Sequence, residues 1–454
     1  MGVWRNHAYI FHKILAWHLT CCPMRFDERE REAVMRVDFS FDARNLEMRS
    51  VFRLLVAAFI GVGLLVPPVV RAQSGAVPAQ QTPPGWIFTP SVVVGGTWDD
   101  NVLLTNPDAN PPGDYGSPIT PAASLSYTGK YTRFSSGYSG SFVRYMTLTE
   151  LNSLQQSLHA TIERRASGRL TFFGQESFTA APTTDVLQLA GVPFYRIGSR
   201  SNAATGGIQA ALSKRVTLRS SYSLHAVDFD TNAFTSNQLQ GGHAHDITTT
   251  VDYSVSRRLT VGGEYEFSRA IVNGRMIGGI AGPEDRFNMQ TAMATAQYQV
   301  DAVTTIYGGF GVALLGSGLT HDARTGPEWR AGFSRRAGRG VVSASYNRSY
   351  IPSFGFGGTF QNEQWMANLR MPLGRTRAYV DGGISWLNND PLDTDQPSLQ
   401  SAWVSSTLGY YATRWLSLEG FYGRTQQDSQ RLGGRRERNQ VGFRVVAAKP
   451  LKLR

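Results

Sequence analysis

His243 and His245, separated by a single residue, are the closest pair of histidines in this 454-residue chain. Residues two apart on a β-strand point to the same side, so the two imidazoles could bind one metal ion. Both histidines share the alternation of Ile247 and Val251, which is the apolar side of the same segment. A metal site on the polar side would need the opposite alternation, and we therefore predict no metal here.

An acidic segment contains Asp390, Asp393 and Asp395, and Asp99 and Asp100 form a second acidic pair. Oxygen-rich loops of this kind can bind Ca²⁺. The segment has no glycine at the EF-hand position and no glutamate that closes the loop. We interpret it as a solvated acidic loop, and the sequence indicates no cofactor.

Two pairs of residues have the chemistry of an acid and a base. His159 and Glu163 fall on one side of their segment, and so do Arg219 and His225. No G-x-S-x-G nucleophile motif is present. We interpret these residues as polar groups that face water, and an enzyme embedded in a barrel is the third of three functional hypotheses.

The other charged residues of the periodic segments share one feature, which is that they fall on the polar side of alternating runs. Charges of both signs across a water-filled lumen create a field that selects solutes. The same charges could instead pair with one another and fill a closed lumen, and the sequence leaves both interpretations open. The predicted lumen-lining residues are Arg133, Arg219, Asp252, Glu264, Glu266, Arg330, Arg370, Arg377, Asp381, Glu419 and Arg444.

A recurring cassette indicates which elements position these charges. A short basic turn is followed by an alternating run in Ser213–Leu218 and again in Ser256–Val261. Apolar–polar alternation on both sides of a tight turn predicts a β-hairpin. We predict eighteen strands, from one near Trp86–Trp98 to one near Arg438–Ala447, or sixteen if a terminal pair is misassigned.

Short and long connections alternate between these strands. The short turns are expected near residues 129, 166, 215, 257, 302, 338, 374 and 413. The long loops are expected near 103–117, 146–152, 180–200, 229–238, 271–285, 316–326, 351–358, 388–398 and 425–436. Short periplasmic turns and long outer loops are typical of bacterial outer-membrane barrels. The predicted fold class is therefore all-β, a transmembrane antiparallel up-and-down barrel that spans residues 86–454.

Alternation also predicts which side chains face lipid. In the run that begins at Leu259, Val261 and Tyr265 fall on one side, and Glu264 and Glu266 fall on the other. Only the apolar side can face lipid, because a charge there is costly. Aromatic residues near strand ends are expected to form interfacial girdles. These are Trp98, Tyr127, Tyr145, Phe178, Phe229, Trp329, Tyr350, Trp386 and Trp415.

A segment near the N-terminus resembles an export signal. Basic residues Arg49 and Arg53 precede the apolar run Leu54–Val66, and small residues allow cleavage after Ala72. We therefore expect residues 48–72 to be a Sec signal peptide and 73–85 to be a flexible periplasmic lead-in. Residues 1–47 are expected to be an extension from a misassigned start.

Composition excludes several classes of protein. Both cysteines, Cys21 and Cys22, precede the expected cleavage site, so disulfides and zinc–thiolate sites are not expected. The net charge of +11 comes mostly from hairpin turns spread along the chain. No basic helix or aromatic platform accompanies it, and nucleic acid is therefore not an expected partner.

The segment Phe88–Val102, with Trp98-Asp99-Asp100-Asn101 near its end, resembles the first strand of the β-barrel porin families of Gram-negative bacteria. The resemblance implies an outer-membrane location, contact with outer-membrane lipid and insertion by the barrel-assembly machinery. It also implies a link to surface-polysaccharide export proteins. One departure is that the last strand contains Phe443 but the chain continues to Arg454, whereas barrel chains usually end on an aromatic residue.

These observations lead to a functional hypothesis with two alternatives. The first is a porin-like passive channel for small polar solutes or glycans. The second is a structural or assembly barrel, plugged by its own loops, that serves surface-polysaccharide export. The embedded enzyme is the third.

Overall fold

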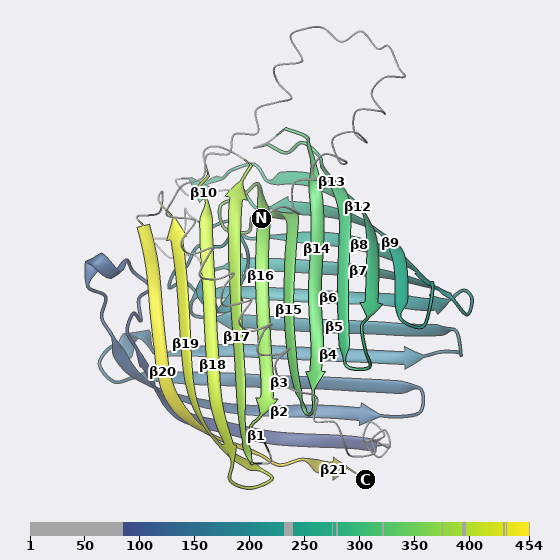
Figure 1. Ribbon diagram of the computed structural model, residues 1–454. Coiled ribbons are helices and arrows are strands. Elements are labelled where there is room, and N and C mark those ends of the chain that lie inside the picture. The colour runs from purple at the N-terminus through teal and green to yellow at the C-terminus, as the bar shows by residue number, and fades with distance from the viewer. Residues whose placement is uncertain are drawn as a thin grey trace, which may run out of the picture. The chain divides into compact units, whose positions relative to one another are not determined.

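The computed structural model describes residues 85–230, 239–274, 276–277, 280–319, 322–374, 376–392, 396–429, 432 and 434–453. The expected signal peptide, the extension before it and residues 73–84 of the lead-in lie outside the described residues. Eighteen long antiparallel strands follow one another around a barrel (Figure 1). They are β1 (Gly85–Asp99), β2 (Asp114–Thr128), β3 (Thr132–Tyr145), β4 (Ser153–Arg165), β5 (Leu170–Ala181), β6 (Ser199–Ala211), β7 (Val216–Phe229), β8 (Gly242–Ser254), β9 (Leu259–Val272), β12 (Asp285–Gln299), β13 (Thr304–Leu315), β14 (Arg324–Ala337), β15 (Gly340–Pro352), β16 (Thr359–Pro372), β17 (Ala378–Pro391), β18 (Leu399–Tyr411), β19 (Leu416–Ser429) and β20 (Gly434–Ala448).

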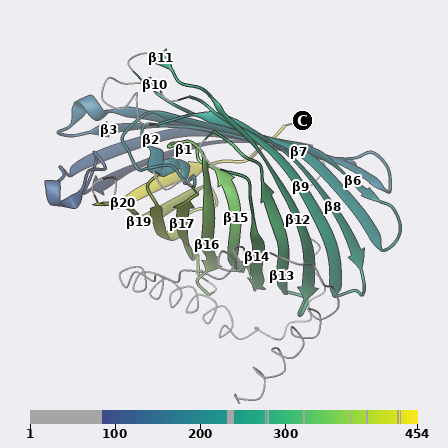
Figure 2. The ribbon, with the colours of Figure 1, turned by 90° about the horizontal axis from the view of Figure 1, so that it is seen from above.

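The barrel closes where the first and last strands meet. β1 pairs with β2 on one side and with β20 on the other, so the sheet has no free edge. Figure 2 shows β1 and β2 beside β19 and β20. A closed antiparallel barrel of eighteen strands confirms the predicted fold class and the larger of the two strand counts.

Several short elements complete the described structure. β21 (Leu451–Leu453) pairs with the beginning of β1, so the segment after β20 continues along the closing seam. β10 (Met276–Ile277) and β11 (Ile280–Ala281) form a small separate hairpin. The 3₁₀ helices are η2 (Pro107–Ala109), η3 (Thr149–Leu151) and η4 (Thr184–Leu187). Within the described residues, none of the helices is long and apolar enough to cross a membrane.

Side-chain capping explains why the basic cassette forms tight turns. The Ser213 hydroxyl accepts hydrogen bonds from the backbone N–H groups of Arg215 and Val216, at 3.1 and 3.0 Å. Ser256 does the same for Arg258 and Leu259. Serine side chains that bond the backbone two and three residues ahead favour turns over continued strand. The basic residues are thereby left exposed at the tip of each hairpin.

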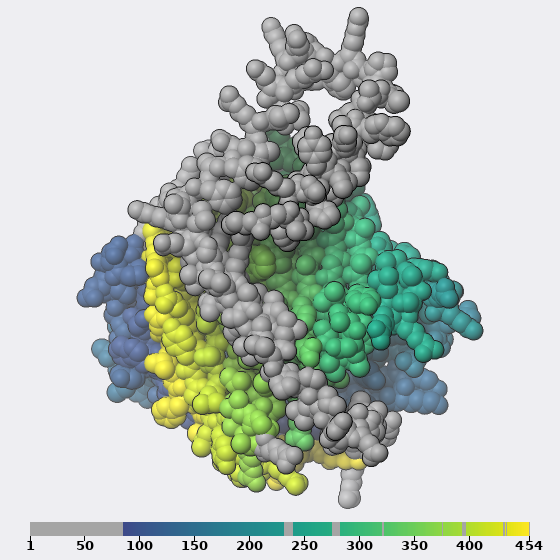
Figure 3. Space-filling model, viewed as in Figure 1, coloured from purple at the N-terminus to yellow at the C-terminus, as the bar shows by residue number. Residues whose placement is uncertain are grey.

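Alternation places apolar side chains on the outside of the barrel. Val261 and Tyr265 of β9 are exposed, and their neighbour Glu264 points inward to bond Arg330 of β14. Large apolar side chains are exposed in the same way on most of the other strands, including β18–β20, whose outer surface faces the viewer in Figure 3. A closed barrel with an apolar outer face is built to span lipid. The chain is therefore an outer-membrane β-barrel.

Some predicted boundaries and aromatic positions are wrong. β19 continues to Ser429 and β20 begins at Gly434, so most of the expected loop 425–436 is strand. Tyr145 is buried inside the barrel beneath the Arg196 guanidinium instead of lying in an outer girdle. Phe229 packs against an internal apolar cluster. Both aromatic residues fall near strand ends, but their side chains point toward the lumen.

The face assignment can be tested with two adjacent substitutions. Ile247 is outward and exposed, whereas Thr248 points inward and donates a hydrogen bond to Glu266. Ile247→Arg should destabilise the barrel by about 2–4 kcal/mol, because it exposes a cation to lipid. Thr248→Arg should be tolerated, because it places the cation in the lumen beside a carboxylate. Heat-modifiable gel mobility measures whether each variant assembles, and reversible unfolding in bilayers measures its free energy of unfolding. Equal tolerance of the two variants would refute the face assignment.

Candidate functional site

Residues 182–198, between β5 and β6, fold into the barrel and form the segment that we call the lumen loop. The loop contains η4 and closes on itself like a hairpin. The Thr184 hydroxyl donates to the Pro193 carbonyl at 2.6 Å and accepts from the Tyr195 N–H at 2.8 Å. The loop therefore has its own internal bonding, and further contacts fix it to the barrel wall.

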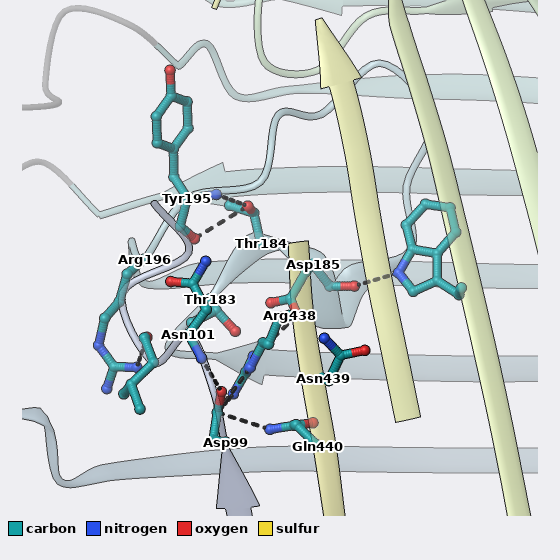
Figure 4. Close-up of polar contacts among 12 residues, drawn as sticks. Asp99, Asn101, Thr183, Thr184, Asp185, Tyr195, Arg196, Arg438, Asn439 and Gln440 are labelled. Atoms are coloured by element: carbon teal, nitrogen blue, oxygen red, sulfur yellow. Dashed lines mark hydrogen bonds and ion pairs between the residues drawn. The ribbon is translucent and has the colours of Figure 1, made fainter. Parts of the chain in front are cut away.

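A buried ion-pair network fastens the lumen loop to the closing seam (Figure 4). Arg438 of β20 donates to Asp99 of β1 through Nε and Nη2, at 2.8 and 2.6 Å. Its Nη1 lies 3.1 Å from Asp185 of the lumen loop. All three side chains are buried, with exposed fractions of 7%, 2% and 3% in the order Arg438, Asp99 and Asp185. One guanidinium thus joins the first strand, the last strand and the loop.

A second anchor lies at the tip of the loop. Phe194 is buried against Leu387 and Trp403, and its ring centroid is 5.3 Å from that of Trp403. Gln427 of β19 accepts from the Phe194 N–H at 2.7 Å and donates to the Val192 carbonyl at 3.0 Å. The backbone polar groups of the tip therefore have a partner on β19, well away from the strands β5 and β6 that the loop joins.

A third anchor is apolar. Val192 packs into a buried cluster with side chains of β7–β13, and Phe354 from the loop between β15 and β16 joins the same cluster. Gly355 of that second loop pairs with Gln240, which follows β7 and precedes β8. The inner surface at the long-loop end of the barrel is thus partly filled by apolar packing.

The motif that ends β1 fastens the first outer loop. Asp100 accepts from the backbone N–H and the side-chain amide of Asn439, at 2.6 and 2.7 Å. The Asn101 amide donates to the carbonyls of Thr105 and Glu437. The acidic pair and asparagine that carry the resemblance to porin families therefore hold the seam and its adjoining loop together.

Two cavities lie against the loop and the wall. One, of about 320 Å³, is lined by Gln155, Gln188, Arg196 and Gln440, among others. The other, of about 200 Å³, shares Gln188 and Gln440 and extends along β16–β19. Both linings combine amide, hydroxyl and charged groups with apolar side chains, so the space suits molecules that have both polar and apolar parts.

Carboxylates collect on the inner surface of β8, β9 and β14, and we call this group the acidic face. Arg330 forms two hydrogen bonds to Glu264, at 2.9 and 2.7 Å. Glu328 accepts from Thr291 at 2.8 Å, and Glu266 accepts from Thr248 at 3.5 Å. A cavity of about 220 Å³ adjoins Glu264, Glu266 and Glu328. The acidic face comprises Asp246, Asp252, Glu264, Glu266 and Glu328.

The remaining predicted lumen residues are distributed around the wall. Arg444 and Tyr379 both bond Glu419, and the Arg444–Glu419 distance is 2.6 Å. Arg370 lies 3.6 Å from Asp381. Ten of the eleven predicted residues take the inward alternation of their strands, and Arg133, Arg219, Asp252 and Glu266 are among them.

Arg377 is placed differently from the other ten. It precedes β17 in a short turn, is exposed, and donates to the Ala412 carbonyl of the next turn. A role for any of the eleven residues in conduction remains a prediction.

The other candidate sites have separate positions. The rings of His243 and His245 lie 5.1 Å apart near the outward Tyr222, whose hydroxyl is 2.7 Å from His245 Nδ1. Among the described residues, no group of three or more His, Cys, Asp or Glu side chains is arranged to hold a metal ion. His225 lies 3.5 Å from Asp246 inside the lumen. Asp393 and Asp395 lie outside the described residues.

No protein-family model matches the chain, and no curated protein matches its sequence. Among solved structures, the chain is similar to OccAB4 of Acinetobacter baumannii, with 10% identity and a TM-score of 0.41 over 82% of this chain and 100% of that chain. OpdQ of Pseudomonas aeruginosa has 10% identity and a TM-score of 0.40, over 81% and 98%. The alcaligin receptor FauA of Bordetella pertussis has 9% identity and a TM-score of 0.41, over 80% and 76%. Likenesses of this degree carry no argument about function, and the barrel assignment rests on the strand pairing.

The anchoring role of Arg438 predicts a selective effect on the loop. Arg438→Met leaves two buried carboxylates without their cation, a change that typically costs about 3–5 kcal/mol. We expect the lumen loop to detach while the barrel still assembles, and single-channel conductance to rise. Arg444→Met is the control. It also removes an arginine of β20 that pairs with a carboxylate, Glu419, but Arg444 does not contact the lumen loop. Equal conductance of the two variants would show that Arg438 does not hold the loop.

Proposed function

We propose that this barrel is a passive outer-membrane channel in which the lumen loop narrows the path and the acidic face favours small polar solutes that are cationic. The observation that carries the proposal is the charge balance of the acidic face. Five carboxylates gather there, and the arginines nearest to them are Arg219 and Arg330. A lumen lined by an excess of one charge sign enriches the opposite ions.

Several charges elsewhere in the lumen are matched by a partner of opposite sign. Arg370 is matched by Asp381, and Arg444 is matched by Glu419. Paired charges largely cancel at a distance, so the field in the lumen is set by the carboxylates of the acidic face and by Arg196 and Arg436, which donate to backbone carbonyls of the first outer loop and the lumen loop. The positive net charge of the whole chain does not oppose this, because the exposed basic residues lie mainly in the hairpin turns.

The size of the expected solute follows from the lumen loop. The cavities beside the loop measure about 320 and 200 Å³, at and below the lower end of the range of sites for small molecules, so the expected solute is small. The loop is fixed by a buried ion-pair network and by apolar packing on two walls. A fixed loop acts as a size filter, whereas a loop that swung freely would give a wide, unselective pore.

A second function is favoured by the same anchoring. The apolar cluster around Val192 and Phe354 and the buried Arg438 network also suit a loop that plugs the barrel completely. In that case the barrel is a structural or assembly component, and the link to polysaccharide export would rest on the resemblance of the first strand.

Ion selectivity tests the proposal directly. In planar bilayers with a salt gradient, the wild-type channel should show a reversal potential of the sign expected for cation preference. The double variant Glu266→Gln, Glu328→Gln should lose most of that preference, because it removes two carboxylates without adding a group of different size.

Glu284→Gln is the matched control, since Glu284 is an exposed carboxylate beside Arg286 in the loop before β12. It should leave the reversal potential unchanged. Anion preference in the wild type would contradict the acidic-face proposal. A complete absence of conductance would favour the plugged barrel.

A further inference from the structure

A carboxylate occupies the lipid-facing side of the barrel where apolar residues are expected. Glu176 of β5 pairs in register with Ala160 of β4 and Ala204 of β6. It shares the alternation of Phe172, which is exposed on the outer wall. Its carboxylate makes no hydrogen bond or ion pair with the described residues. An ionisable side chain at this depth is expensive and generally has a functional partner.

The wall around Glu176 is hollowed. A shallow cavity of about 420 Å³ lies there, and its lining is mostly apolar. Alanine and glycine form its floor, at Ala160, Gly174, Ala204 and Gly206, and larger side chains form its rim, at Phe134, Ile162, Tyr222 and Leu224. Small residues on a membrane-facing surface allow a second protein surface to approach closely.

Gly206 is not required by the barrel itself. A Cβ atom added at this position would meet no other atom within 4 Å, and the residue does not have a positive φ. The open space above it is therefore available to a neighbouring molecule. A larger side chain at Gly206 would fill that space without disturbing the fold.

The symmetry of a membrane dimer determines which residues would meet. Two copies inserted in the same direction can be related by a twofold axis only if the axis is parallel to the membrane normal, so residues at equal heights face one another. Glu176 is the seventh residue of β5, counted from Leu170 at the short-turn end. Tyr222 is the seventh residue of β7, counted from Val216 at the same end. β6 lies between these strands.

We propose that the outer wall of β5–β7 is the interface for a second copy of this chain. A twofold axis that passes over Gly206 and Ala204 brings Glu176 of each copy opposite the partner's Tyr222. Each hydroxyl can donate to the opposite carboxylate, so two identical hydrogen bonds flank a close contact between small residues. His245 Nδ1, 2.7 Å from the Tyr222 oxygen, can donate to that oxygen and leave the phenol hydrogen free for Glu176.

Self-complementarity favours a second copy over other occupants. The acceptor and the donor lie at equal heights on either side of the small residues, which is the arrangement that an isologous contact requires. An acyl chain would fill the hollow but would offer no donor to Glu176. Lipid binding is therefore an alternative that the experiment distinguishes.

Subunit counting in supported bilayers, by single-molecule photobleaching of the labelled full-length protein, measures the oligomeric state. The wild type should be dimeric at densities where Glu176→Leu and Gly206→Leu are monomeric. We expect each substitution to weaken dimerisation at least about tenfold, through loss of the hydrogen bonds or of close approach. Gly420→Leu is the matched control, because Gly420 is an exposed glycine of β19 with equally open space. It should remain dimeric.

Cysteine crosslinking locates the interface in native outer membranes. Ala204→Cys, near the proposed axis, should form a disulfide-linked dimer on mild oxidation, whereas Leu418→Cys on β19 should not. A wild type that is monomeric at every density overturns the proposal, whether or not lipid occupies the hollow. So does a dimer that survives both Glu176→Leu and Gly206→Leu, or equal crosslinking at positions 204 and 418. All the variants leave the lumen unchanged, so ion selectivity is tested separately.

Discussion

The guanidinium of Arg438, buried between Asp99 and Asp185, is the interaction on which the interior arrangement depends. A buried charge is tolerated only when it is paired and hydrogen-bonded, and the removal of one partner costs far more than a surface ion pair contributes. Asp99 ends the first strand, Arg438 lies in the last strand and Asp185 belongs to the lumen loop. A single network therefore couples closure of the barrel to the position of the segment that narrows it.

Along each strand of the barrel wall, side chains alternate between the lipid outside and the water-filled lumen inside. Outward residues satisfy lipid, and inward residues can carry charge without affecting that surface. Hydrogen bonds between neighbouring strands pair the backbone N–H and C=O groups, so the sheet does not depend on the inward side chains. The charged side chains in the lumen can therefore be arranged for selectivity. The acidic face uses this freedom. Glu176 departs from the pattern, because it carries a charge on the lipid side, and the proposed dimer interface is built around that departure.

The local elements could be predicted from the sequence because their causes are local. Turns such as Ser256–Leu259 form through hydroxyl bonds two and three residues ahead, and alternation along each strand assigns the two faces. The lumen loop could not be predicted. Asp185 and Arg438 are 253 residues apart, and nothing near either residue indicates the other. Tyr145 and Phe229 share the inward alternation of Arg133 and Arg219, so alternation already indicated the lumen, and assigning them to a girdle from their position near strand ends was wrong. A weak signal was available in Val192 and Phe194, which are apolar side chains in an expected outer loop.

The central claim is that the lumen loop stays on the far wall while the channel conducts. The most direct test is a short thiol crosslink between Phe194→Cys and Leu387→Cys, whose native side chains pack together. Conductance is compared before and after crosslinking of the same channels. Efficient crosslinking with unchanged conductance is the predicted result. Failure to crosslink, or conductance that falls when the loop is locked to the wall, would show that the loop leaves the wall when solutes pass.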